Sequence, residues 1–165
     1  DLAFSVSACT RPPRAGEEHG RDYYFFNEEE FKELIDADAF AEWEMVYAGK
    51  YYGTLRSELS RIWHAGQAPL VDIDVKGALA IQKQYPDSAL SIFIQAPSPE
   101  VLKQRLLKRG SETPQSLEER ISKAGFELSF ANNFDKIIVN DDLNTASDEL
   151  LNVVQSFLTH TDNPA

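Results

Sequence analysis

The hydrophobic positions of the chain alternate between two periodicities. Short apolar runs bounded by polar residues predict strands, whereas apolar residues spaced three or four apart predict helices. Strands are predicted over residues 2–7, 40–46, 70–73, 90–94 and 136–139. Helices are predicted over residues 27–35, 54–66, 75–85, 99–108 and 143–158, and from residue 116 onward. Because strands separated by helices need crossover connections, the pattern favours an α/β fold with a parallel sheet covered on both faces, as in doubly wound nucleotide-binding folds.

Local signals set several of these boundaries. Asn27 and Glu30 have the spacing of a capping box, in which each side chain accepts a hydrogen bond from a backbone N–H at the start of a helix. Thr54 is predicted to open the next helix as its N-cap, and Gly66 to end it. The buried face of that helix is predicted to consist of Leu55, Leu59, Ile62 and Trp63.

The composition fits one compact domain. With 165 residues, of which 42% are hydrophobic, the chain can bury a substantial core and is short for two ordinary domains.

The formal net charge of -11 repels nucleic acid and anionic membranes, so we expect a small ligand held by a local cluster of positive charge. Cys9 is the lone cysteine, and no apolar run has the length of a signal peptide or membrane span. We therefore expect a cytoplasmic protein without a nucleic-acid or membrane partner.

Two arginines flank a pair of prolines near the start of the chain. Pro12 and Pro13 fix their own φ and bias the preceding residues toward extended backbone, which predicts polyproline II geometry over residues 10–13. With three residues per turn, Arg11 and Arg14 would leave the same side of the chain, and two guanidinium groups so placed suit a phosphate. The alternative is an exposed proline-rich loop with two solvated arginines.

Several acidic and hydroxyl side chains accompany the predicted strands. Asp72 and Asp74 are two residues apart at a predicted strand end, which would place both carboxylates on one face of the sheet. The N–H groups of a purine or the water shell of a metal ion would give them partners, and the alternative is that they cap a neighbouring helix. Glu42, Tyr52 and Thr54 add an acid, a phenol and a hydroxyl, each of which also fits an ordinary structural role.

A second basic cluster lies in residues 101–123, which hold six basic residues against three acids. Arg105 and Arg109 are four apart on one predicted helix, and Arg120 follows on the next. A helix-turn-helix flap of this kind can close its arginines over a charged ligand and stabilise charge on a phosphoryl group in transfer. The alternative is a solvated basic face.

With these residues in place, the chain resembles the guanylate kinases, the ATP-dependent kinases that phosphorylate GMP, over essentially its whole length. The resemblance rests on the motifs Phe4-Ser5-Val6-Ser7, Thr10-Arg11-Pro12-Pro13-Arg14-Ala15-Gly16-Glu17, Tyr51-Tyr52-Gly53-Thr54, Asp72-Ile73-Asp74-Val75, Arg109-Gly110 and Val139-Asn140-Asp141-Asp142-Leu143.

The resemblance implies roles for the candidate residues. Carried over by position, the residues that bind the GMP phosphate are Arg11, Arg14, Tyr23 and Tyr52. The residues that read guanine are Ser7, Glu42, Thr54 and Asp74. The lid arginines that close on ATP correspond to Arg105, Arg109 and Arg120. Asp72 would lie near the magnesium ion and the phosphates, and Asn140 in the loop that passes the adenine.

The architecture implied by the resemblance is a P-loop nucleoside monophosphate kinase core of parallel strands in one domain over residues 1–165. A small mixed GMP-binding subdomain is expected at about residues 27–54 and a helical lid at about residues 105–125. The implied reaction, in purine nucleotide metabolism, is in-line transfer of the γ-phosphoryl group of ATP, with Mg²⁺, to GMP. The family implies a monomer or a homodimer.

One family motif is missing from the chain. No segment matches G-x-x-x-x-G-K-[ST], the loop whose backbone amides and lysine hold the ATP phosphates. The strand before that loop lies in the middle of the family's sheet, and its loss would leave neighbouring strands with unpaired backbone groups. We therefore expect the natural chain to begin upstream of Asp1.

A different class of function stays open at this point. Guanylate-kinase-like modules in scaffold proteins have lost catalysis and use the GMP site to hold phosphopeptides. Such a module needs neither the three lid arginines nor a full set of guanine-reading residues, and this chain carries both sets. The sequence therefore favours the enzyme.

Overall fold

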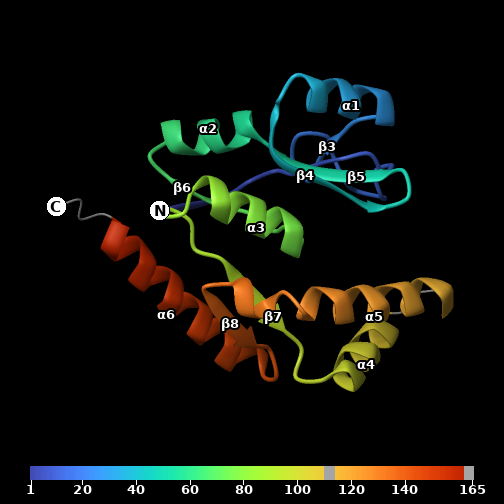
Figure 1. Cartoon of the computed structure of the whole chain (residues 1–165), viewed down its shortest axis with the longest axis vertical. Coiled ribbons are helices and arrows are strands. Elements are labelled where there is room, and N and C mark those ends of the chain that lie inside the picture. The colour runs from blue at the N-terminus through green and yellow to red at the C-terminus, as the bar shows by residue number, and fades with distance from the viewer. Residues whose placement is uncertain (110–113, 162–165) are drawn as a thin grey trace. The chain divides into compact units, whose positions relative to one another are not determined.

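The computed structural model describes residues 1–109 and 114–161, with the side chains of residues 1–108 and 114–159. The chain divides into two compact units, Asp1–Gln84 and Tyr85–Ala165, drawn from blue to green and from yellow-green to red in Figure 1. Each unit contains parallel strands and helices, and the predicted α/β class is confirmed.

The first unit has the elements β1 (Leu2–Phe4), β2 (Ala8–Cys9), β3 (Tyr24–Phe25), α1 (Glu28–Asp36), β4 (Phe40–Tyr47), β5 (Lys50–Leu55), α2 (Arg56–His64), β6 (Ala68–Leu70) and α3 (Val75–Gln84). Strands β1 and β6 form a two-stranded parallel sheet. The other four strands form a mixed sheet in the order β3-β2-β5-β4. In it β5 is antiparallel to both of its neighbours, and β2 is parallel to β3.

Helix α1 covers one face of the mixed sheet, as Figure 1 shows. Its only buried residue is Phe31, whose ring stacks on Phe40 of β4 at 4.4 Å between centroids. Ala8 of β2 and Leu55 of β5 complete this core. The helix begins at the predicted capping box, in which Asn27 and Glu30 bond each other's backbone N–H. Burial of the Phe31 face therefore fixes α1 on the sheet.

A β-bulge in β4 separates this core from the opposite face. Phe40 lies opposite Leu55 and Glu42 lies opposite Thr54, with a register shift between the two pairs. Side chains two residues apart on a regular strand share a face, but the extra residue of a bulge reverses that relation. Phe40 therefore enters the core while Glu42 reaches the other face.

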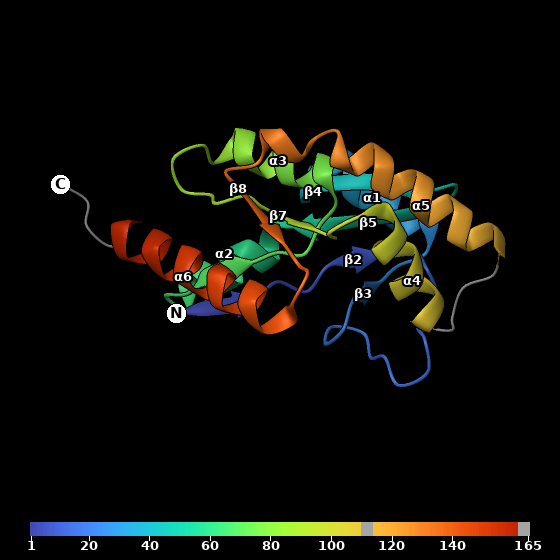
Figure 2. The same cartoon turned by 90° about the horizontal axis from the view of Figure 1, so that it is seen from below.

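The second unit has the elements β7 (Ile92–Gln95), α4 (Pro99–Arg109), α5 (Pro114–Leu128), η1 (Ala131–Asn133), β8 (Lys136–Val139) and α6 (Leu143–Thr161). Strands β7 and β8 pair in parallel, with Ile92 opposite Lys136. Helix α4 packs against α5, and α6 packs against β8 (Figures 1 and 2). None of the helices in the described part of the chain has the length and apolar character needed to cross a membrane.

Several predictions of element boundaries and burial were wrong. Thr54 does not cap a helix, because it lies in β5, where pairing with β4 continues to Leu55, and α2 begins at Arg56. The strand predicted over residues 70–73 lies at Ala68–Leu70, paired with β1. Trp63 is 47% exposed, whereas the other three residues of its predicted face are buried. Tertiary pairing overrode local propensity at Thr54.

Replacing Phe31 with Ala should lower the free energy of unfolding by about 3–5 kcal/mol, because a fully buried ring leaves a cavity between α1 and the sheet. Urea denaturation followed by circular dichroism measures the change. Met45→Ala, at a residue 49% exposed on β4, is the matched control and should cost less than about 1 kcal/mol. Equal stability of Phe31→Ala and the parent would contradict this account of the core.

Candidate functional site

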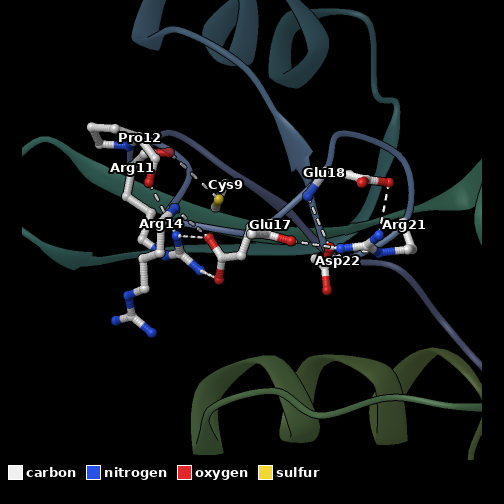
Figure 3. Close-up of polar contacts among 9 residues, drawn as sticks. Cys9, Arg11, Pro12, Arg14, Glu17, Glu18, Arg21 and Asp22 are labelled. Atoms are coloured by element: carbon white, nitrogen blue, oxygen red, sulfur yellow. Dashed lines mark hydrogen bonds and ion pairs between the residues drawn. The ribbon is translucent and has the colours of Figure 1, made fainter.

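The first part of the site is a cation held among aromatic rings. The guanidinium of Arg11 donates two hydrogen bonds to the carboxylate of Glu17, at 2.6 and 2.8 Å. It also lies 4.7 Å from the centroid of the Tyr23 ring. In Figure 3 the Glu17 carboxylate faces Arg11, whereas the side chain of Arg14 extends away from it. The two arginines predicted to act together therefore differ, because Arg11 is half-buried in an ion pair and Arg14 is exposed.

The ion pair fixes the charges of both groups. Hydrogen bonds from the Arg11 guanidinium and from the backbone N–H of Arg14 lower the pKa of Glu17 to about 2. The Glu17 carboxylate in turn raises the pKa of Arg11. Both groups therefore stay charged across the physiological range, and the guanidinium is held in one orientation.

Two tyrosines lie beside this cation. The ring of Tyr23, from the segment just before β3, meets the ring of Tyr52 on β5 edge to face at 6.4 Å. Burial raises the pKa of Tyr52, which keeps its hydroxyl protonated as a hydrogen-bond donor. The structure thus brings together Arg11, Tyr23 and Tyr52, three of the four residues expected to bind a phosphate.

The second part of the site is acidic. Glu42 on β4 is 7% exposed, and Thr54 on β5 donates its hydroxyl proton to Glu42 Oε1 at 2.6 Å. Burial raises the pKa of Glu42 to about 7, and the nearby Asp74 carboxylate acts in the same direction. Hydrogen bonds from the hydroxyl and the backbone of Thr54 lower this pKa, but burial outweighs them. Glu42 is therefore a buried acceptor whose hydrogen bonds come from Thr54.

Gly77 makes room for the acidic group. A Cβ atom at this position would lie 2.5 Å from Glu42 Oε2 and 3.5 Å from Asp74 Oδ1. The shorter distance is far inside van der Waals contact, so any side chain there would displace the Glu42 carboxylate. Asp74 also accepts a hydrogen bond from the Gly77 backbone N–H at 2.9 Å. Glu42, Thr54 and Asp74 thus converge, as expected.

Asp72 and Asp74 do not share a strand face. The strand β6 ends at Leu70, so both aspartates lie in the connection to α3. Asp74 is half-buried and caps α3, which realises the helix-capping alternative, whereas Asp72 is exposed. Ser7 directly precedes β2, whose Ala8 lies opposite Gly53 beside Thr54. The chain therefore places Ser7 near the acidic group but leaves Asp72 at the surface.

The remaining candidates belong to the second unit. Arg105 donates to the carbonyl oxygens of Asn140 and Asp141, at 2.6 and 3.0 Å. It therefore ties α4 to the loop after β8 that carries Asn140. Arg120 is half-buried on α5. The side chain of Arg109 lies outside the part of the chain that the structure describes.

Sequence reasoning missed three residues that shape the site. Glu17 orients Arg11, Gly77 admits Glu42, and Glu58 of α2 is a buried carboxylate bonded to segments on either side of the arginine loop. The sequence gives only weak signals of these roles, namely an acid six residues after Arg11 and a glycine three after Asp74. Long-range partners such as Val6 and Glu58 have no local signature.

The pKa of Glu42 predicts a pH dependence of stability. Because its pKa is higher in the folded than in the unfolded state, the favourable contribution is complete below about pH 4.5 and is lost as the pH rises through about 7. The loss should reach about 3 kcal/mol. Glu42→Gln should abolish this fall in the free energy of unfolding, measured by urea denaturation from pH 4.5 to 8.

Glu33→Gln, at an exposed position, is the control, and its free energy of unfolding should depend on pH as that of the parent does. The pKa values of Glu17 and Glu58 are held at about 2, so their contributions to stability are lost as the pH falls, below pH 4.5 and outside this window. If the free energy of unfolding of Glu42→Gln fell with pH as much as that of the parent, Glu42 would not be the source of this pH dependence.

Comparisons with known proteins agree with this geometry. The sequence model of the family described as guanylate kinase matches residues 1–157. A guanylate kinase from Bacteroides fragilis is 48% identical over 158 residues, covering 96% of this chain and 78% of that protein. One from Porphyromonas gingivalis is 45% identical, covering 96% and 84%.

A solved structure supports the same relationship. The crystal structure of guanylate kinase from Anaplasma phagocytophilum matches with a TM-score of 0.79 and 33% sequence identity, covering 94% of this chain and 75% of that chain. The family match spans more than half of the chain, and it includes every candidate site residue. The chain therefore belongs to the guanylate kinase family.

Proposed function

We propose that this member of the guanylate kinase family phosphorylates GMP, with ATP as the phosphoryl donor. The observation that carries the proposal is that one unit of the chain holds both a cationic, aromatic group and a buried acidic group. The first consists of Arg11, Tyr23 and Tyr52, and the second of Glu42, Thr54 and Asp74. A nucleoside monophosphate presents the matching pair of features, a dianionic phosphate and a base.

The acidic group suits guanine. Guanine donates hydrogen bonds from N1 and from its exocyclic N2 amine, and carboxylates accept such bonds. It also presents an acceptor at O6, to which a hydroxyl such as that of Ser7 can donate, while the Thr54 hydroxyl proton is held by Glu42. Adenine lacks the N2 amine, so it would leave the Glu42 carboxylate without that partner. We therefore assign guanine reading to Ser7, Glu42, Thr54 and Asp74.

The cationic group suits the GMP phosphate. Arg11 is already oriented by Glu17, and Arg14, from the same loop, is exposed and can turn toward an incoming anion. The hydroxyls of Tyr23 and Tyr52 supply two further donors. No side-chain nucleophile is needed, because the phosphate oxygen of GMP is itself the attacking group. The role of these residues is to position the acceptor and screen its charge.

We assign the ATP side to the second unit. Arg105, Arg109 and Arg120 would form the lid, at about residues 105–125, that neutralises charge on the transferred group. The contacts of Arg105 with the 140–141 backbone support a further role for this residue in holding the loop of Asn140 near the adenine. The GMP-binding part, at about residues 27–54, shares its sheet with β2 and β3.

Mg²⁺ would enter as the partner of the ATP phosphates. The described residues contain no group of three or more His, Cys, Asp or Glu side chains able to hold a metal ion by themselves. The exposed carboxylate of Asp72 fits contact with the water shell of a phosphate-bound ion. The buried, free Cys9 fits a reducing compartment and supports a cytoplasmic location.

A coupled assay of ADP release by the full-length protein tests this proposal. GMP should be phosphorylated, and AMP should show a kcat/KM at least about 100-fold lower, because AMP leaves the buried acceptors unpaired. Titration with a phosphopeptide in parallel tests the alternative of a binding module. Tight phosphopeptide binding without ADP release in the presence of GMP would contradict the enzymatic function.

The double substitution Arg11→Ala, Arg14→Ala should raise the KM for GMP by about 10- to 100-fold, because two charge-assisted contacts to the phosphate are lost. Arg21→Ala is the matched control. Arg21 lies in the same loop but is exposed and pairs with Glu18 and Asp22 (Figure 3). Unchanged GMP affinity in the double variant would rule out the assigned phosphate site.

A further inference from the structure

A buried carboxylate outside the assigned site joins the two segments that carry it. Glu58 of α2 is 2% exposed. Its Oε1 accepts hydrogen bonds from the Tyr24 hydroxyl at 2.9 Å and from Arg61 Nε at 2.8 Å. Its Oε2 accepts from the Val6 backbone N–H at 3.0 Å and from Arg61 Nη2 at 2.9 Å. Both oxygens are therefore satisfied twice, which is what a buried charge requires.

Two of these donors adjoin site residues. Val6 directly precedes Ser7, and Tyr24 directly follows Tyr23. The backbone N–H of Tyr24 also donates to the carbonyl of Ser7 at 2.9 Å, so the two segments and the carboxylate form a closed set of contacts. Consecutive α-carbons are separated by a fixed 3.8 Å across a trans peptide. Fixing Val6 and Tyr24 therefore restricts the positions of Ser7 and Tyr23.

We propose that Glu58 is a positioning residue for the nucleoside monophosphate. Its carboxylate fixes the Ser7 segment, on the guanine side, relative to the Tyr23 segment, on the phosphate side, so that both ends of one GMP molecule can be bound together. The inference rests on the proposed function, and it assigns a role to a residue that does not itself touch the substrate.

The chemistry of the contacts requires a carboxylate. Val6 and Tyr24 both donate, as does Arg61, so the side chain at position 58 must accept on both of its terminal atoms. A Gln amide has nearly the same shape but replaces one acceptor oxygen with a donor NH₂ group. In Glu58→Gln the NH₂ group would either leave the Val6 N–H without an acceptor or face Tyr24 and Arg61 Nε, where it can donate to the Tyr24 oxygen but leaves Arg61 Nε unpaired. The substitution therefore weakens this set of contacts with little change in volume.

Steady-state kinetics of the full-length protein test the inference. Glu58→Gln should raise the KM for GMP by about tenfold, and Tyr24→Phe, which removes only the bond to the Tyr23 segment, by about threefold. The KM for ATP should stay within about twofold of the parent in both variants. Glu29→Gln makes the same charge change at an exposed position of α1 and should leave both KM values unchanged.

A merely structural role would give a different result. It would lower the melting temperature of Glu58→Gln while the KM for GMP stayed at the parent value, or it would raise both KM values equally, and either outcome overturns the inference. If Glu58→Gln does not fold, an unchanged KM for GMP in Tyr24→Phe overturns it instead. A parent protein that does not phosphorylate GMP would contradict the proposed function, whereas normal parent kinetics with unaffected variants would contradict this inference alone.

Discussion

The two-sided character of the mixed sheet is the constraint on which the assigned monophosphate site depends. Along β5, Tyr51 and Leu55 face α1 and its Phe31 core, whereas the alternate residues Tyr52 and Thr54 face the other way. A slip of one residue in register would bury the polar set and expose the apolar one. The same burial that fixes the sheet therefore also fixes where the site residues point.

The buried or paired carboxylates of the first unit are of two kinds, those that bond an arginine and one, Glu42, that lies beside a hydroxyl. Glu17 and Glu58 each bond an arginine, and those hydrogen bonds hold their pKa values at about 2. Glu42 is buried beside a hydroxyl instead, and desolvation raises its pKa to about 7. A buried acceptor of this kind is a group that a ligand's N–H groups can complete, which is consistent with the proposed role of Glu42.

The arginines divide in a similar way. Arg11 and Arg105 are both held by hydrogen bonds to oxygen atoms of their own unit, Arg11 by a carboxylate and Arg105 by two backbone carbonyls. Arg14 remains exposed on a loop. Each held arginine keeps a fixed orientation, which lowers the entropy cost of binding an anion. The proposed role of Glu58 extends this principle from single side chains to whole segments.

The sequence alone determined the α/β class, the capping box of α1 and the residue types of both site groups, because these follow from local periodicity and spacing. It could not determine that Thr54 lies in a strand, because pairing with β4 outweighs the preference of threonine for a helix start. The bulge that turns Glu42 away from Phe40 also depends on pairing with a partner strand. The contacts of Glu58 join residues as far as 52 positions apart, and only packing of the folded chain brings such groups within hydrogen-bonding distance.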